Sequence, residues 1–115
     1  MPKDERVFPD DPLEFIKTRV KERKIKWTYH VNMRMKDRFI SREYIINPAD
    51  SFQVIEEHPN DKYLPSYLIY SEYQTRAFHI LFAADVQGDN VRIVTAYYPT
   101  PDEWNDELKT RRSSS

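Results

Sequence analysis

The spacing of hydrophobic residues changes period near residue 52, which limits the chain to folds that place helices before strands. Up to residue 51, apolar residues recur at three- and four-residue intervals, as on one face of an α-helix. Between Phe52 and Tyr98 they recur mainly at two-residue intervals, as in β-strands. Because the connections between these strand segments are short, consecutive strands are expected to pair antiparallel. The pattern predicts an α+β fold.

A first helix is expected to begin at Pro12. Asp11 before it is a favourable N-cap, and a proline in the first helical position loses no hydrogen bond. Leu13, Ile16 and Val20 recur at helical spacing along one face. We therefore expect these three side chains to form the buried stripe of the helix.

A second helix is expected to follow Thr28, which is also a favourable N-cap. Val31 and Met35 fall on its core-facing side, and Phe39 follows them at the next interval. Ser41 is a favourable N-cap for a short third helix. These assignments place the first three helices ahead of every predicted strand.

One edge of the second helix carries positively charged and titratable side chains. His30, Arg34 and Arg38 stand at positions i, i+4 and i+8 and spread over about 80° of the helix, so we expect them to converge on a single anionic group. Residues 17–42 contain ten Lys or Arg and two Asp or Glu, a local charge of +8 in a chain of net charge −1. This asymmetry favours an anionic ligand. Ordinary solvation of exposed helix faces explains the charge equally well.

Four strands and a final helix are expected in the second half. The predicted strands cover residues 52–57, 67–73, 76–84 and 91–98, and the sequence from Thr100 to Glu103 has the form of a helix capping box. Trp104 and Leu108 would pair on this last helix. The expected architecture is N-terminal helices packed on a three- to four-stranded antiparallel sheet, with a closing C-terminal helix. Residues 11–112 are expected to form one domain, between a flexible arm over 1–10 and a frayed tail over 113–115.

Composition excludes several kinds of site. The chain has no cysteine, which rules out disulfides, thiolate metal ligands and a cysteine nucleophile. Its three histidines are scattered, so we expect no metal site and no cofactor. The longest apolar run, residues 78–84, is much shorter than the roughly 20 residues of a membrane helix, and no apolar signal region precedes it. We therefore expect a cytoplasmic protein without a membrane partner.

Two residues of the predicted sheet are candidates for chemistry. His79 lies within a strand among large apolar residues, where a polar group must find a partner or line a cleft. Tyr97 lies near the end of the last strand, where side chains often line a site. A histidine side chain can move protons near neutral pH. The alternative interpretations are a hydrogen-bonded core histidine and an ordinary strand aromatic.

These polar residues belong to a longer pattern. It begins with His30-x3-Arg34-x3-Arg38-x-Ile40-Ser41, continues with Phe78-His79-Ile80, and ends with Thr95-x-Tyr97-x-Pro99-x-Pro101-x2-Trp104. In this combination the chain, from about Pro12 to Arg112, resembles the domain of unknown function family 4258. Phe39 stands where that family commonly has glycine. The family is in turn similar to the RelE/ParE and MqsR toxins of type II toxin–antitoxin systems.

The resemblance implies a small α+β, RelE/ParE-like fold with a curved antiparallel sheet. It also implies a toxin that acts as an mRNA endonuclease, either on the ribosome or on free RNA. Members are often encoded beside a small protein with a Cys-x2-Cys zinc finger, so an antitoxin of that kind is the expected partner. The matching polar positions are His30, Arg34, Arg38, His79 and Tyr97.

The leading hypothesis is a metal-independent endoribonuclease. Either His30 or His79 would deprotonate a ribose 2′-OH, and the other histidine or Tyr97 would protonate the 5′-oxygen leaving group. Arg34 and Arg38 would bind the phosphate and stabilise its developing charge. Two alternatives stay open: a non-catalytic module that binds protein or nucleic acid, and a toxin that inhibits a protein target such as gyrase.

Overall fold

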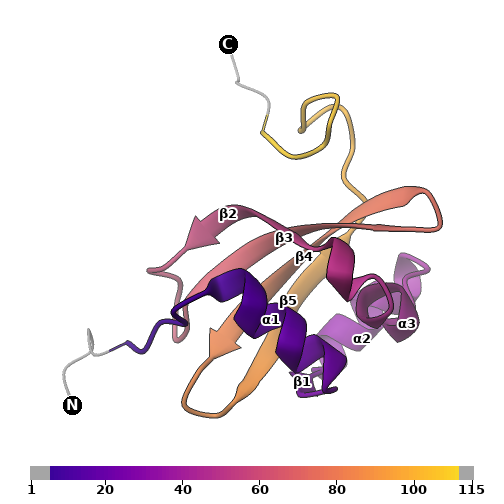
Figure 1. Cartoon of the computed structure of the whole chain (residues 1–115). Coiled ribbons are helices and arrows are strands. Elements are labelled where there is room, and N and C mark those ends of the chain that lie inside the picture. The colour runs from indigo at the N-terminus through magenta and orange to yellow at the C-terminus, as the bar shows by residue number, and fades with distance from the viewer. Residues whose placement is uncertain (1–5, 112–115) are drawn as a thin grey trace.

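A five-stranded mixed sheet carries three α-helices on one face (Figure 1), in a computed structural model that describes residues 6–111. The elements in chain order are α1 (Pro12–Lys21), β1 (Ile25–Lys26), α2 (Tyr29–Asp37), α3 (Arg42–Ile46), the 3₁₀ helix η1 (Ala49–Ser51), β2 (Gln53–His58), β3 (Ser66–Tyr73), β4 (Arg76–Asp85) and β5 (Asn90–Tyr97). The strand order is β1-β5-β4-β3-β2, and the sheet is open. The first five residues of the predicted arm and the predicted tail lie outside the described residues. No described helix is long and apolar enough to cross a membrane.

The predicted three- to four-stranded antiparallel sheet is wrong. The four predicted strands are present and form an antiparallel meander, but β1 adds a fifth strand that pairs parallel to β5. In this pairing Ile25 lies opposite Val91, and Lys26 lies opposite Arg92. A two-residue strand is too short for its hydrophobic period to be recognised in the sequence. The sheet is therefore mixed, which contradicts the RelE/ParE-like arrangement expected for the chain.

The predicted closing helix is also wrong, because residues 98–111 form turns and irregular backbone. Trp104 is 1% exposed and forms an isolated bridge with Arg111. Leu108 has a φ of 63°, which is outside the right-handed helical region. Burial of the Trp104 ring against the sheet thus outweighs the local capping preference of the preceding residues.

The first two helix starts form as the sequence predicts. Asp11 Oδ1 accepts a hydrogen bond from the Glu14 backbone N–H at 3.1 Å. Thr28 Oγ1 accepts one from the Val31 N–H, also at 3.1 Å. The predicted stripe residue Ile16 is fully buried. These caps satisfy N–H groups that have no partner inside the helices.

The end of α2 differs from the expectation that Phe39 continues its buried face. The Ile40 N–H bonds the Met35 carbonyl at 2.8 Å, and the Phe39 N–H bonds the Lys36 carbonyl at 3.1 Å. This is a Schellman motif, which reverses the chain through a left-handed residue. Phe39 occupies that position with a φ of 58° and is 87% exposed, while Ile40 enters the core instead.

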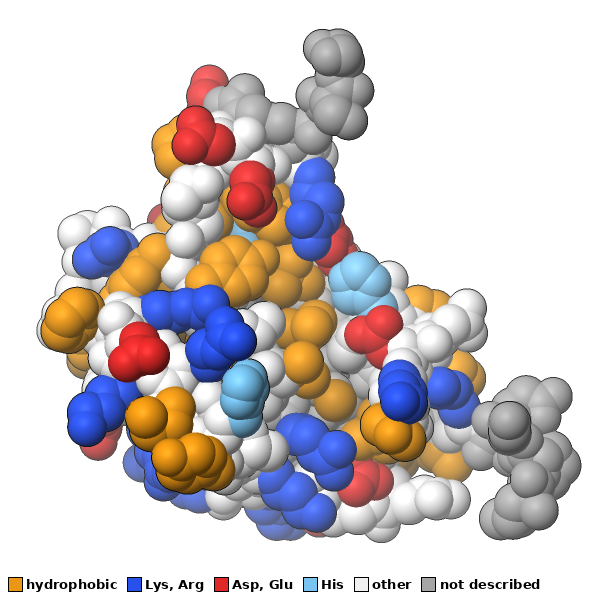
Figure 2. Space-filling view, turned by 180° about the vertical axis from the view of Figure 1, so that it is seen from behind, with side chains coloured by type: hydrophobic (Ala, Val, Ile, Leu, Met, Phe, Trp, Pro, Cys, Tyr) orange, Lys and Arg blue, Asp and Glu red, His pale blue; other side chains and the backbone are white. Residues whose placement is uncertain are grey.

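Alternate residues of the central strands point to opposite sides of the sheet. One side packs against the helices through a core that includes Val31, Met35, Ile69, Ile80 and Ile93. The other side, here called the open face, carries Leu68, Tyr70, His79, Leu81, Ala83, Arg92, Thr95 and Tyr97. Figure 2 shows the molecule from this side, where charged side chains of both signs lie around a central group of hydrophobic side chains.

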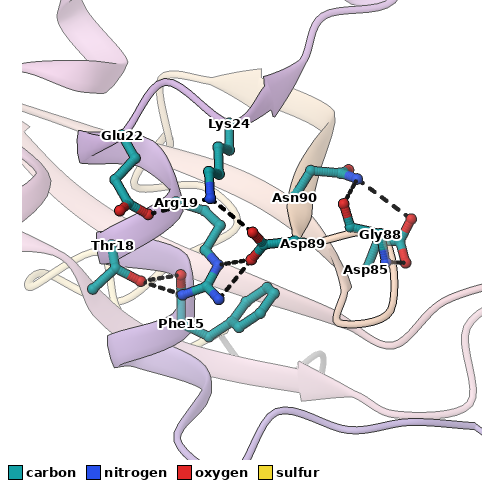
Figure 3. A network of polar contacts seen from close by, with 9 residues as sticks. All are labelled: Phe15, Thr18, Arg19, Glu22, Lys24, Asp85, Gly88, Asp89 and Asn90. Carbon is teal, nitrogen blue, oxygen red and sulfur yellow. Dashed lines mark hydrogen bonds and ion pairs between the residues drawn. The ribbon is translucent and has the colours of Figure 1, made fainter.

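A polar network fixes α1 to the turn between β4 and β5 (Figure 3). Asp89 accepts hydrogen bonds from Arg19 Nε at 2.9 Å and from Lys24 Nζ at 2.7 Å. These two bonds, that from Lys24 first, hold the pKa of Asp89 below its usual range. In the same turn the Asp85 carboxylate accepts the Gly88 N–H, and a Cβ at Gly88 would overlap that carboxylate. A side chain at Gly88 would therefore require the Asp85 and Asn90 side chains to move.

Left-handed backbone is unusually frequent in this chain. The described non-glycine residues with positive φ are Arg23, Phe39, Tyr63, Gln74, Thr75, Asp89 and Leu108. Gly88, the single glycine in the sequence, does not have a positive φ. A left-handed conformation costs most residues roughly 1–2 kcal/mol, so these positions store strain.

Candidate functional site

Arg38 reaches the edge of β5 from the end of α2. Its Nη1 donates to the Ala96 carbonyl oxygen at 2.7 Å and to Thr95 Oγ1 at 3.3 Å. Arg38 can turn towards the sheet because it is the C-cap residue, where the chain leaves α2. Thr95 belongs to the open face, so the Arg38 charge lies at the border of that face. Its positive charge also acts to lower the pKa of Tyr97.

Tyr97 and His79 form a polar pair on the open face. They lie directly opposite each other on β5 and β4, with His79 Nδ1 3.2 Å from the Tyr97 hydroxyl oxygen. His79 Nε2 lies 2.6 Å from the Leu108 carbonyl oxygen. A carbonyl can only accept, so Nε2 carries the hydrogen and Nδ1 accepts from the Tyr97 hydroxyl. Both ring nitrogens of His79 are therefore engaged.

Burial determines the charge state of this pair. His79 is 0% exposed, and its ring lies 4.4 Å from the Trp104 ring, centroid to centroid. Burial lowers the pKa of His79, and the bond to Leu108 and the charge of Glu56 oppose this shift only in part. Burial likewise raises the pKa of Tyr97. At neutral pH the pair is thus a neutral imidazole and a protonated phenol.

An ion pair beside this pair joins the C-terminal segment to β2. Arg111 Nε donates to Glu56 Oε2 at 2.6 Å, and Arg111 Nη2 donates to Glu56 Oε1 at 3.2 Å. His58 Nε2 lies 3.2 Å from the same Oε1. The charges of Glu56 and Arg111 act on the pKa of both His79 and Tyr97. Sequence reasoning did not find this cluster, because its members are distant in the chain and have no common spacing.

His30 lies at the start of α2, where that helix borders a different part of the open face. It lines a groove of about 260 Å³ together with Lys62, Tyr63 and Arg92, over the hydrophobic side chains of β4 and β5. His30 is exposed, and so is Arg34 on the same edge of α2. Sequence reasoning missed Arg92, because simple alternation puts it on the opposite side from Tyr97 and only the bulge at residue 94 brings both residues to one face. Nothing in the sequence marks Lys62.

Four of the five predicted site residues fall into two groups, and the fifth, Arg34, is exposed on α2 outside both. Arg38, Tyr97 and His79 lie together near the end of β5, whereas His30 lies in the groove. His30 and Arg38 are eight residues apart, about 12 Å along a helix axis, and contact different residues. The single convergent anion site that we expected is therefore not formed. The chain instead carries Arg34 on α2, Arg38 at its C-cap and Arg92 on β5, three arginines that we call the cation row. Several separate cations suit a ligand with several successive negative charges.

No group of three or more His, Asp or Glu side chains arranged to hold a metal ion occurs within residues 6–111. The candidate site thus consists of hydrogen-bonding, cationic and aromatic side chains.

The match to a known family covers this site. A family described as "Domain of unknown function (DUF4258)" matches residues 27–98. The chain belongs to this family. The DUF4258 match begins just before α2 and ends just after β5, so it contains all five predicted site residues. Helix α1 and the segment that carries Trp104, Leu108 and Arg111 lie outside it. No curated protein and no solved structure matches the chain.

Proposed function

We propose that this DUF4258 protein is a metal-independent endoribonuclease that cuts single-stranded RNA and serves as the toxin of a type II toxin–antitoxin system. The observation that carries the proposal is the position of Arg38, whose guanidinium is held at the β5 edge next to the Tyr97–His79 pair. A fixed cation beside a proton-transfer pair is what phosphodiester cleavage by an internal nucleophile requires. The sequence resemblance to RelE/ParE and MqsR toxins, which does not extend to the arrangement of the mixed sheet, supports the physiological role.

In the proposed reaction Tyr97 is the catalytic residue. Its hydroxyl accepts the proton of the ribose 2′-OH while it passes its own proton to His79 Nδ1, which faces it at 3.2 Å. His79 acts as a positioning residue and proton acceptor, oriented by the Leu108 carbonyl. The 2′-oxygen attacks the phosphorus, the bond to the 5′-oxygen breaks, and water protonates the leaving group. The hydroxide that remains takes a proton from the Tyr97 hydroxyl, which recovers its own proton from His79 Nδ1. The product carries a 2′,3′-cyclic phosphate.

Arg38 stabilises the charge that develops on the phosphate oxygens. Its guanidinium has further N–H donors beyond those bonded to Thr95 and Ala96, and it keeps its charge at any relevant pH. His30, Arg34 and Arg92 bind flanking phosphates of the same strand. This assignment replaces the predicted acid–base role of His30 with a binding role, because His30 does not share the surroundings of Arg38.

The decisive variant is Tyr97→Phe, which removes one oxygen atom and keeps the ring. Purified protein would be incubated with a mixed-sequence RNA in chelator, and cleavage and affinity would be measured separately. We expect Tyr97→Phe to lose about 10²-fold or more in cleavage rate while RNA affinity stays the same. Tyr29→Phe, at an exposed position on α2, is the matched control and should cleave as the wild type does. Cleavage that requires a divalent cation, or equal rates for both variants, would contradict the proposal.

Expression in a bacterial host tests the toxin role. The wild type should arrest growth and produce new RNA 5′ ends, and Tyr97→Phe should do neither. A neutralising partner encoded nearby, with a Cys-x2-Cys zinc finger, should restore growth. Arrest with intact RNA would instead indicate a toxin that acts on a protein target such as gyrase.

One observation favours a second candidate, a non-catalytic RNA-binding module. His79 is fully buried and both its ring nitrogens have partners, as expected of a structural histidine. In that case RNA would bind along the cation row with strong salt dependence, and no product would form. The Tyr97→Phe comparison separates the two candidates, since only the enzyme needs the hydroxyl.

A further inference from the structure

A second cavity lies on the other side of the β5 end from Tyr97. It has a volume of about 290 Å³ and is lined by Phe39, Tyr44, Tyr73, Gln74, Arg76, Phe78 and Tyr98. We call it the aromatic pocket. Phe39 directly follows Arg38, and Tyr98 directly follows Tyr97, so the pocket lies on the helix side of the same strand end whose open face carries the Tyr97–His79 pair.

The walls of the aromatic pocket are held by contacts among its own residues. The Arg76 guanidinium carbon lies 3.7 Å from the centre of the Tyr98 ring. The Tyr98 hydroxyl donates to the Phe39 carbonyl at 3.4 Å. The Tyr44 and Tyr73 rings pack with their centres 5.1 Å apart. The pocket is therefore formed before any ligand enters it.

Phe39 lies at this pocket at an energetic cost. Its φ of 58° is unfavourable for any residue with a Cβ, and with 87% exposure it gains little from burial. The neighbouring turn residues Gln74 and Thr75 also have positive φ. Backbone strain that is not offset by burial of the side chain is concentrated at binding sites, where the strained residue contacts a ligand.

We propose that the aromatic pocket holds one nucleobase of the single-stranded RNA, where the strand passes around the end of β5 from the proposed cleavage site. Phe39 would stack on the base, as exposed aromatic side chains do in single-strand binding proteins. Arg76 supplies a planar cation that stacks on aromatic rings, and the Gln74 amide can both donate and accept at a base edge. A volume near 300 Å³ is the lower end of ligand sites, which suits one base. This proposal rests on the proposed function, because it takes RNA as the substrate.

The probes are eight-residue 2′-O-methyl oligonucleotides of A, C and U, each with a fluorescent label. They lack the 2′-OH nucleophile and cannot be cut by the proposed reaction. Binding is therefore measured whether or not the protein is a nuclease. Dissociation constants from fluorescence anisotropy would be compared for the wild type, Phe39→Gly, Phe39→Trp, Gln74→Ala and Tyr29→Ala.

We expect Phe39→Gly to weaken binding about tenfold and Phe39→Trp to retain it. Glycine is favoured at a positive φ, so loss of binding in Phe39→Gly cannot come from loss of folding. Tyr29→Ala removes another exposed aromatic residue of α2, outside the pocket, and should bind as the wild type does. Gln74→Ala should reduce the difference in affinity among the three probes.

Equal affinity of Phe39→Gly and the wild type for all three probes would overturn the proposal. The pocket would then be a site for a side chain of a partner protein. Absence of binding by the wild type would overturn it as well. If Phe39→Gly loses binding while the wild type cuts no RNA, the base site stands and the nuclease proposal fails.

Discussion

The hydroxyl oxygen of Tyr97 lies 3.2 Å from Nδ1 of His79, directly across two paired strands. The same imidazole contacts the Leu108 carbonyl through its other nitrogen. One ring thus connects the end of the sheet to a segment outside the DUF4258 match. Any change in the charge of His79 must act on both partners, because the ring is sealed from water.

Stability should fall as the pH drops below that at which an ordinary histidine ionises. Burial lowers the pKa of His79 in the folded state, so the unfolded chain binds more protons between that value and about 6.5. The contribution of His79 is complete above pH 6.5 and is lost as the pH falls. Urea unfolding at several pH values should give a flatter profile for His79→Gln, which cannot titrate. An equal slope in both proteins would show that His79 does not titrate on unfolding.

Trp104→Ala should destabilise the protein strongly. The ring is 1% exposed and packs edge-on against His79, and loss of a buried tryptophan costs about 3–5 kcal/mol. Because the ring covers His79, its removal should also raise the pKa of that imidazole, which NMR titration can follow. Tyr63→Ala, at a position 74% exposed, is the control and should change unfolding free energy by less than about 1 kcal/mol. A similar cost for both variants would show that Trp104 is not a packing anchor.

Phe39→Gly should stabilise the protein by about 1 kcal/mol. Glycine relieves the left-handed strain, and the exposed ring contributes little buried area. Phe39→Ala keeps the Cβ and should not stabilise the protein. The difference in unfolding free energy between the two variants, measured with denaturant, therefore gives the cost of the left-handed backbone. If glycine gave no gain over alanine, the Schellman turn would be unstrained.

Arg38→Met should reduce both RNA affinity and its salt dependence. Removal of one phosphate contact should make the plot of log affinity against log salt shallower by about 0.7 for a single strand. Lys17→Met removes one charge from α1, outside the proposed RNA site, and should leave the slope unchanged. If both variants lowered the slope equally, RNA binding would depend on the overall charge of the protein and not on a phosphate contact at the β5 edge.

Sequence patterns among neighbouring residues predicted the structural features that depend on interactions between neighbouring residues. The caps at Asp11 and Thr28 and the positions of the four longer strands follow from side-chain chemistry and hydrophobic period, and the structure confirms them. The two-residue β1 and the irregular path around Trp104 depend on contacts between distant parts of the chain. No spacing in the sequence encodes such contacts.

The candidate site was partly predictable for the same reason. Periodicity placed His30, Arg34 and Arg38 on one helix edge, but the length of that helix decides whether they converge. The left-handed turn at Phe39 ends α2 early and directs Arg38 to β5. The pairing of Tyr97 with His79 follows from strand register, which alternation alone leaves open.

The frequency of left-handed residues also concerns the unfolded chain. The unfolded state of a polypeptide with one glycine has fewer backbone conformations than that of a polypeptide with glycine at every tight turn. It therefore loses less conformational entropy on folding. Strain at residues such as Gln74 and Asp89 is thus partly offset by the smaller entropy of the denatured ensemble. Several glycine substitutions together should therefore gain less than their summed individual effects on the folded state.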